Sequence, residues 1–130
     1  MRAILCLIGV ISTLAALPAQ AASVAPEARL AKALEGRVAG KPVDCIPQHQ
    51  IQSSQIFERT AILYKVGSVW YVNRPRMGAN FLDRDDILVT DTHSPNLCSV
   101  DIVRLLDQSS RFPDGTLGLG TFVPYKKPKG

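Results

Sequence analysis

Residues 61–74 of the chain, AILYKVGSVWYVNR, predict a β-hairpin. Two runs rich in β-branched and aromatic residues flank Gly67 and Ser68, and a two-residue turn with glycine is a strong hairpin signal. This turn places Tyr64 opposite Tyr71. Both faces of the hairpin then carry apolar side chains, so we expect the rest of the chain to cover each face in part.

Further short strands are expected on both sides of this hairpin. The candidates are residues 53–58 ahead of a turn at Glu58-Arg59, residues 86–90, residues 98–106 with alternation from Val100, and residues 115–125. Glycines 118 and 120 alternate with leucines, which predicts a bend or a second backbone packed close by. The residues PDG at 113–115 predict a turn, because proline fixes φ and glycine accepts positive φ.

One short helix is expected ahead of the strands. Pro26 suits a first helical turn, and Gly36 suits a position just past a helix end. The predicted fold is mainly β, a small antiparallel barrel or sandwich-like meander with one short N-terminal helix. The predicted domain limits are 22–42 for helix and linker, 43–125 for a single β-rich domain and 126–130 for a basic tail.

The first 21 residues have the pattern of a secretory signal peptide. Arg2 precedes an uncharged run at residues 3–17, and small residues follow at positions suited to cleavage after Ala21 or Ala22. Spanning a bilayer takes about 20 apolar residues, so a retained anchor is the weaker alternative, and no later stretch is apolar enough to span. We therefore expect a periplasmic or secreted protein with no transmembrane segment after signal removal.

Cleavage removes Cys6 and leaves two cysteines, Cys45 and Cys98. Exported proteins enter an oxidising compartment in which two thiols normally pair, so we expect a disulfide. The alternative is a metal-binding protein, because Cys45, Cys98, His49 and His93 form a Cys2His2 set of the kind that binds zinc. Their spacing matches no known motif. We favour the disulfide and expect no metal and no cofactor.

The segment LDRDDIL gathers Asp83, Asp85 and Asp86 in one predicted loop. A pair of these carboxylates could serve a hydrolase as acid and base, given burial and a set separation. A solvated, charged turn is the simpler interpretation, because loop charges are usually solvated. No nucleophile elbow, phosphate loop, dinucleotide fingerprint or zinc-protease helix is present. The sequence therefore favours binding over catalysis.

A second candidate surface combines Arg74 and Arg76 with the nearby Trp70 and Tyr71. Such a basic, aromatic-edged surface would suit an anionic envelope component such as a sugar–phosphate polymer. The alternative is that these arginines guard a sheet edge. Removing Arg2 lowers the formal net charge from +4 to +3, and so small a surplus does not indicate a nucleic-acid partner.

The segments GKPVDCI, TAILYKVGSVWYVNRPR, LDRDDILVT, LCSVDIVRLL and GLGTFVPYKKP resemble a group of uncharacterised short exported proteins of Gram-negative, alphaproteobacterial-type bacteria. The resemblance covers residues 36–128. It implies a periplasmic or outer-envelope setting and supports pairing of Cys45 with Cys98, and it implies no activity. The function expected from the sequence is a non-catalytic envelope binding or structural module.

Overall fold

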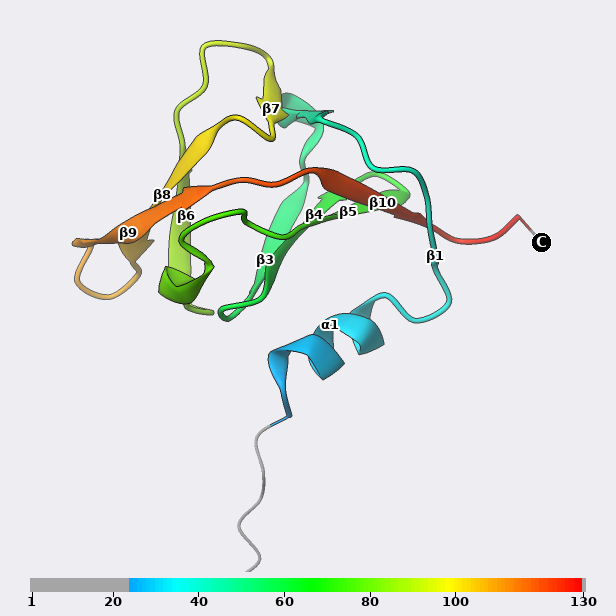
Figure 1. Cartoon of the computed structure of the whole chain (residues 1–130), viewed down its shortest axis with the longest axis horizontal. Helices are drawn as coiled ribbons and strands as arrows, with labels where there is room; N and C mark the ends of the chain where they lie inside the picture. The colour runs from blue at the N-terminus through cyan, green and yellow to red at the C-terminus, as the bar shows by residue number, and fades with distance from the viewer. Residues whose placement is uncertain (1–23, 130) are drawn as a thin grey trace, which may run out of the picture.

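The computed structural model describes residues 24–129, which form antiparallel sheets and one α-helix, as the sequence predicts (Figure 1). The predicted signal peptide lies outside the described residues. Within residues 24–129, no helix is both long and apolar enough to cross a membrane. The elements are α1 (Pro26–Ala33), β1 (Val38–Ala39), β2 (Cys45–Pro47), η1 (Gln48–Gln50), β3 (Ser53–Phe57), β4 (Ala61–Val66), β5 (Val69–Asn73), η2 (Ala79–Phe81), β6 (Asp86–Thr90), β7 (Asn96–Cys98), β8 (Ile102–Asp107), β9 (Pro113–Gly118) and β10 (Phe122–Lys126).

Helix α1 begins and ends where the sequence places its signals. Pro26 lies in the first turn, where its missing N–H leaves no helical hydrogen bond unmade. Glu27 follows it, and a carboxylate is favourable near the positive end of a helix. The chain leaves the helix through Gly36, whose φ of +78° suits a residue without a Cβ. Leu30 is the buried side chain that fastens α1 to the sheet.

The larger sheet has five strands in the order β1-β10-β5-β4-β3, all antiparallel. The predicted hairpin forms its centre, and Tyr64 lies opposite Tyr71 as expected. Gly67 has a φ of +57°, which the tight turn requires. Residues 36–42, predicted as linker, include β1, which pairs with the end of β10 at Lys126.

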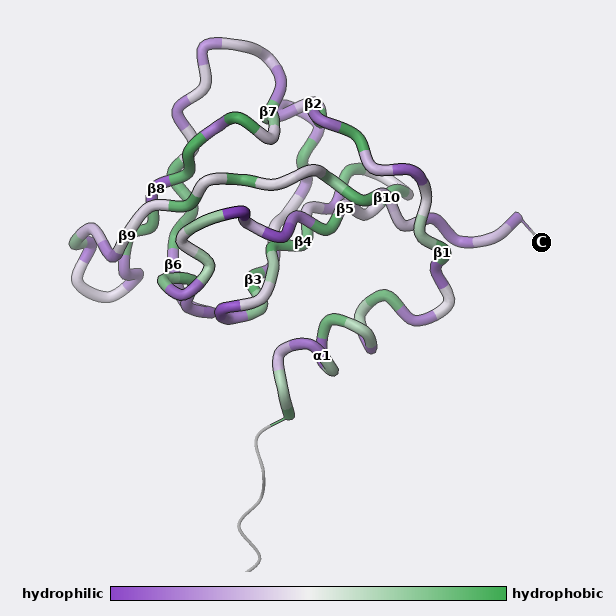
Figure 2. Tube along the Cα trace, viewed as in Figure 1, coloured by the Kyte–Doolittle hydropathy of each residue, from purple (hydrophilic) through white to green (hydrophobic). Residues whose placement is uncertain are grey.

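Each face of this sheet is covered, as the hairpin pattern predicts. Helix α1 packs on one face, and the residues buried there are Leu30, Leu34, Phe57, Ala61, Leu63 and Val72. The second sheet packs against the other face over a larger core of Ile46, Ile56, Ile62, Tyr64, Leu82, Leu97, Val103, Leu105, Leu117, Leu119 and Phe122. Figure 2 shows the chain beyond β10 as hydrophilic, away from both cores.

The second sheet has the order β6-β8-β9 and is joined to the first along one side. Gly118 accepts a hydrogen bond from Arg76 N (2.9 Å) and donates one to Met77 O (3.0 Å), so β9 continues alongside the chain that follows β5. Within the described residues, β3 pairs only with β4 and β6 only with β8. The sheets do not close, so the sandwich-like alternative is confirmed and the barrel alternative is wrong.

The alternating strand predicted from Val100 onward begins two residues later, at Ile102. A turn separates β7 from β8, because Asp101 N donates to Cys98 O (3.0 Å) and the Asp101 carboxylate accepts from Cys98 N (2.7 Å). Strand β8 therefore starts at Ile102 and buries Val103 and Leu105 instead of Ile102.

The predicted turn at residues 113–115 is also wrong. The chain reverses earlier, where the Asp107 carboxylate accepts hydrogen bonds from the backbone of Ser109 (3.0 Å) and Ser110 (2.6 Å). Arg111 then takes a positive φ of 62°. Pro113 becomes the first residue of β9, a position where a missing N–H is tolerated.

The two glycines predicted to lie near another backbone do so. A Cβ on Gly120 would lie 2.3 Å from Arg74 O, and Gly118 is hydrogen-bonded to the backbone of Arg76 and Met77. The buried Asn73 side chain fixes this crossing, because it donates to Gly120 O (2.7 Å) and accepts from Gly120 N (3.0 Å). A larger residue at 120 would push β5 and β10 apart.

Candidate functional site

Cys45 and Cys98 are joined by a disulfide, the pairing expected from the sequence. They lie directly opposite each other in the two-stranded sheet β2-β7, with Cα atoms 4.0 Å apart. The bond links segments 53 residues apart in the chain. The chain-entropy model gives such a link about 4 kcal/mol of stabilisation. Its role in this fold is to hold β2 and β7 against the larger core.

The disulfide removes the Cys2His2 alternative, because bonded sulfurs are not thiolate ligands. His49 lies in η1 and His93 in the loop before β7, and both side chains are exposed. No group of three His, Cys, Asp or Glu side chains suited to a metal ion occurs within residues 24–129.

The candidate hydrolase carboxylates, Asp83, Asp85 and Asp86, do not face one another across a cleft. The Asp86 carboxylate accepts from Asp83 N (2.9 Å), and the Asp83 carboxylate accepts from Arg84 N (2.6 Å). Asp83 and Asp85 are exposed, whereas Asp86 is half-buried and lines a groove. The pKa of Asp86 is raised, mainly because the carboxyl is partly buried, and neighbouring carboxylates add to the effect. These carboxylates mainly satisfy the backbone of their own turn.

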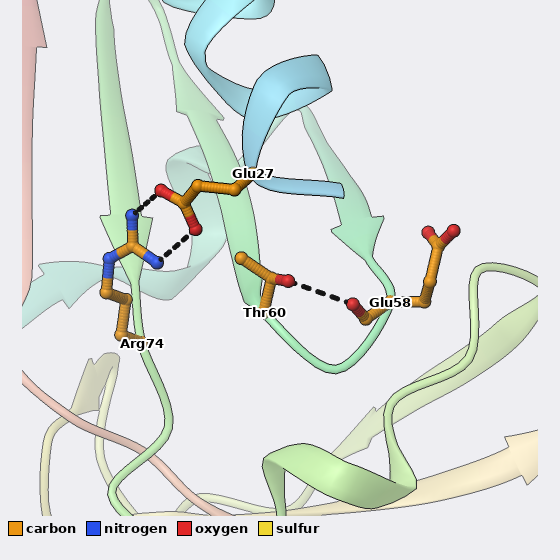
Figure 3. Close-up of polar contacts among 4 residues, drawn as sticks. All are labelled: Glu27, Glu58, Thr60 and Arg74. Atoms are coloured by element: carbon orange, nitrogen blue, oxygen red, sulfur yellow. Dashed lines mark hydrogen bonds and ion pairs between the residues drawn. The ribbon is translucent and has the colours of Figure 1, made fainter. Parts of the chain in front are cut away.

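The predicted surface at Arg74 and Arg76 is not assembled as expected. Arg74 makes a two-pronged ion pair with Glu27 of α1, with N–O distances of 3.0 and 2.6 Å (Figure 3). Trp70 packs beside the helix-side core and Tyr71 beside the opposite core, so the two rings face different sides of the sheet. Arg76 lies at the crossing with β9 and not at a sheet edge. Arg74 thus has its charge partner within the fold.

The structure gathers positive charge at a different place. A cavity of about 390 Å³, the basic cleft, is lined by Arg37, Ser68, Lys126, Lys127 and Lys129. Arg37 comes from the segment after α1, Ser68 from the β4-β5 turn, and the lysines from the end of β10 and the residues after it. Pairing of β10 with β1 on one side and with β5 on the other brings these three segments together. Four of the five lining side chains are cationic.

Arg37 is held in a fixed position at the wall of the basic cleft. Its Nη1 donates to Ser68 O (2.8 Å) and to Tyr125 O (3.3 Å), which ties it to two other segments. Its guanidinium lies 3.7 Å from the ring centroid of Trp70, and Lys65 Nζ lies 4.4 Å from the same centroid. Cations over an indole are stabilised by the ring quadrupole. Trp70 therefore supports the cationic side chains of this region.

The charge of the basic cleft is not neutralised by the fold. The ion pairs among the described residues are Arg29–Glu58 and Arg74–Glu27, and neither involves a residue of the cleft. Cations left without a carboxylate in a concave site attract anions, because the surrounding protein concentrates the field. The arrangement can therefore hold an anionic group between Arg37 and the lysine ammonium groups.

Sequence reasoning singled out Trp70 but missed Arg37 and treated the lysines as a solvated tail. The signal available was the run YKKPKG at residues 125–130, which follows a predicted strand directly. What could not be read from it was the pairing of β1 with β10, which carries Arg37 to those lysines.

Searches against protein-family models, curated protein sequences and solved structures find no match.

Proposed function

We propose that this protein is a small exported domain that binds an anionic component of the cell envelope in the basic cleft. The observation that carries the proposal is the cavity lined by Arg37, Ser68, Lys126, Lys127 and Lys129, in which four cations have no carboxylate partner among the described residues. Phosphate groups suit this lining, since guanidinium donates two parallel hydrogen bonds and ammonium supplies a point charge.

The proposed setting is the periplasm or the cell exterior. The signal-peptide pattern of residues 1–21 supports it. The Cys45–Cys98 disulfide fits an oxidising compartment. In that setting a phosphate-bearing glycan or polymer is the natural class of ligand, and the protein acts through binding.

A calorimetric titration with a short inorganic polyphosphate tests the proposal. Replacing Lys126 and Lys127 together by glutamine should weaken binding by about tenfold, which corresponds to about 1.4 kcal/mol. The matched control replaces Arg76 and Arg104 by glutamine, because both are exposed cations outside the basic cleft. The control removes the same charge and should leave the affinity close to that of the unaltered protein.

Three results would contradict the proposal. The first is equal weakening in both double variants, which would mean that only net charge matters. The second is an absence of polyphosphate binding by the unaltered protein at low salt. The third is binding of an uncharged dextran at similar strength. Site binding should also weaken as salt rises, because added ions screen the charges.

A further inference from the structure

The two sheets leave a gap at the side opposite their junction. Strands β3 and β6 are the outer strands there, and a groove of about 430 Å³ lies between them. Three consecutive residues of each strand line it, 54–56 and 86–88, together with Arg29 and Arg84. Within residues 24–129 no backbone hydrogen bond joins β3 to β6. A single bond, from Arg59 N to Leu82 O (3.1 Å), ties the chain together just beyond the groove.

Residues beside this groove are exposed on faces that are buried elsewhere. Ser54 pairs with the buried Tyr64 and shares its face, yet Ser54 is exposed. Leu88 pairs with the buried Leu105 and is only half-buried. In both pairs the inner residue has a strand on each side, and the outer residue has a strand on one side only. The core is therefore complete except where one strand is lacking.

Neither strand carries a lysine or a proline. Natural edges are guarded by lysine, proline, a bulge or a covering segment. Strand β3 reads SSQIF and β6 reads DILVT, with Asp86 as the lone charge in the two strands. Edge N–H and C=O groups without a strand partner are satisfied by another extended backbone or by water. The chemistry of the groove thus selects a polypeptide in extended conformation.

We propose that the groove between β3 and β6 binds an extended segment of a partner protein by strand addition. A folded second copy is a poor fit, because an edge strand of an intact sheet cannot enter a gap with walls on both sides. Residues 127–129 do not fill it either, since they follow β10, whose end pairs with β1 at the edge of the larger sheet opposite β3 (Figure 1).

The groove also sets the side-chain pattern of the segment. Alternate residues of a strand face opposite sides, so inward residues meet the core side at Leu88 and Ile56 and should be apolar. Outward residues meet Arg29 and Arg84, and of the charged side chains lining the groove only Asp86 is negative. The Arg29 guanidinium contacts Glu58, whereas Arg84 has no ion pair among the described residues. An acidic residue on the outward face complements Arg84.

The probe that tests this is a short synthetic peptide of alternating valine and glutamate. On binding, amide hydrogen exchange should slow in β3 and β6 by about tenfold or more, as for newly formed ladder hydrogen bonds. The same peptide with N-methyl groups on every residue keeps its side chains and loses the N–H donors along both edges. It should protect neither strand.

A matched pair of variants separates the groove from general charge effects. Ser54→Asp places a charge in the groove and should weaken the peptide by about tenfold. Ser53→Asp adds the same charge at the neighbouring exposed residue, which does not line the groove, and should bind as the unaltered protein does. Both positions are exposed, and circular dichroism checks that both variants fold.

Three results would overturn the proposal. One is equal binding of the methylated peptide, which would mean that side chains alone attract it. The second is exchange protection that omits β3 and β6, or that is the same in Ser54→Asp. The third is a dimer in sedimentation that protects the same strands without peptide, which would make a second copy the occupant. None of these results depends on the basic cleft, so the two proposals succeed or fail separately.

Discussion

Asn73 is the polar side chain buried in the described core, and it connects β5 to the break between β9 and β10. Both of its hydrogen bonds go to the backbone of Gly120. Removing the amide leaves a buried N–H and C=O without partners, which costs more than the bonds themselves contribute. Asn73→Ala should lower the free energy of unfolding by about 2–4 kcal/mol, counting two groups.

Urea unfolding measures this loss, with Asn80→Ala as the control at an exposed position. The control should change stability by less than about 0.5 kcal/mol. A loss as small for Asn73→Ala as for Asn80→Ala would contradict the role given to Asn73.

The Glu27–Arg74 ion pair is exposed and should contribute little. In the folded protein the pKa of Glu27 lies below its ordinary value of 4.5, mainly because Arg74 donates a hydrogen bond to the carboxylate. A carboxyl with a lowered folded pKa adds stability above its unfolded pKa and loses it as pH falls through the folded one. Glu27→Gln should therefore cost less than about 1 kcal/mol at neutral pH and less still at about pH 3.

Unfolding of Glu27→Gln at both pH values checks this sign. Glu35→Gln serves as the control, since Glu35 is exposed and makes no ion pair among the described residues. A cost that grows as the pH falls would refute the assignment.

Strands β2 and β7 have only three residues each, so the disulfide is the main restraint on the small sheet that they form. Replacing Cys45 and Cys98 together by alanine avoids a free thiol and should lower stability by about 4 kcal/mol. Denaturant unfolding of this variant, beside the reduced unaltered protein, measures the effect. A loss under about 1 kcal/mol in both would show that the core alone holds β2 and β7.

The elements that the sequence predicts well are those with local signals. The hairpin at Gly67 and the helix between Pro26 and Gly36 are set by residues within the elements themselves. The predictions of a strand from Val100 and of a turn at residues 113–115 were wrong. The chain instead turns where the carboxylates of Asp101 and Asp107 accept hydrogen bonds from nearby backbone N–H groups. An aspartate in a strand-like run looks the same in sequence whether it turns the chain or faces solvent.

At the scale of the whole molecule, the two larger sheets of the described residues are joined on one side and open on the other. The junction at Gly118 and the gap between β3 and β6 arise from pairings between distant segments, which single-sequence patterns do not specify. The same holds for the basic cleft, which needs β1 beside β10. The sequence therefore predicts the fold class and the disulfide, whereas the candidate sites depend on how distant strands meet.

The basic cleft and the β3-β6 groove draw on different residues and different chemistry. Lysines and Arg37 line the first, and backbone edges line the second. A protein with both could hold an envelope polymer and a partner protein at once. Simultaneous binding is then expected to be nearly independent, because no residue lines both sites.

Fluorescence of Trp70 is a direct test of anion binding in the basic cleft. Trp70 is the single tryptophan of the chain and lies against Arg37 and Lys65. Titration with inorganic polyphosphate should change its emission in a saturable way that added salt reverses. The variant lacking Lys126 and Lys127 should need about tenfold more ligand. Emission that stays constant, or that changes identically in this variant, would contradict the account.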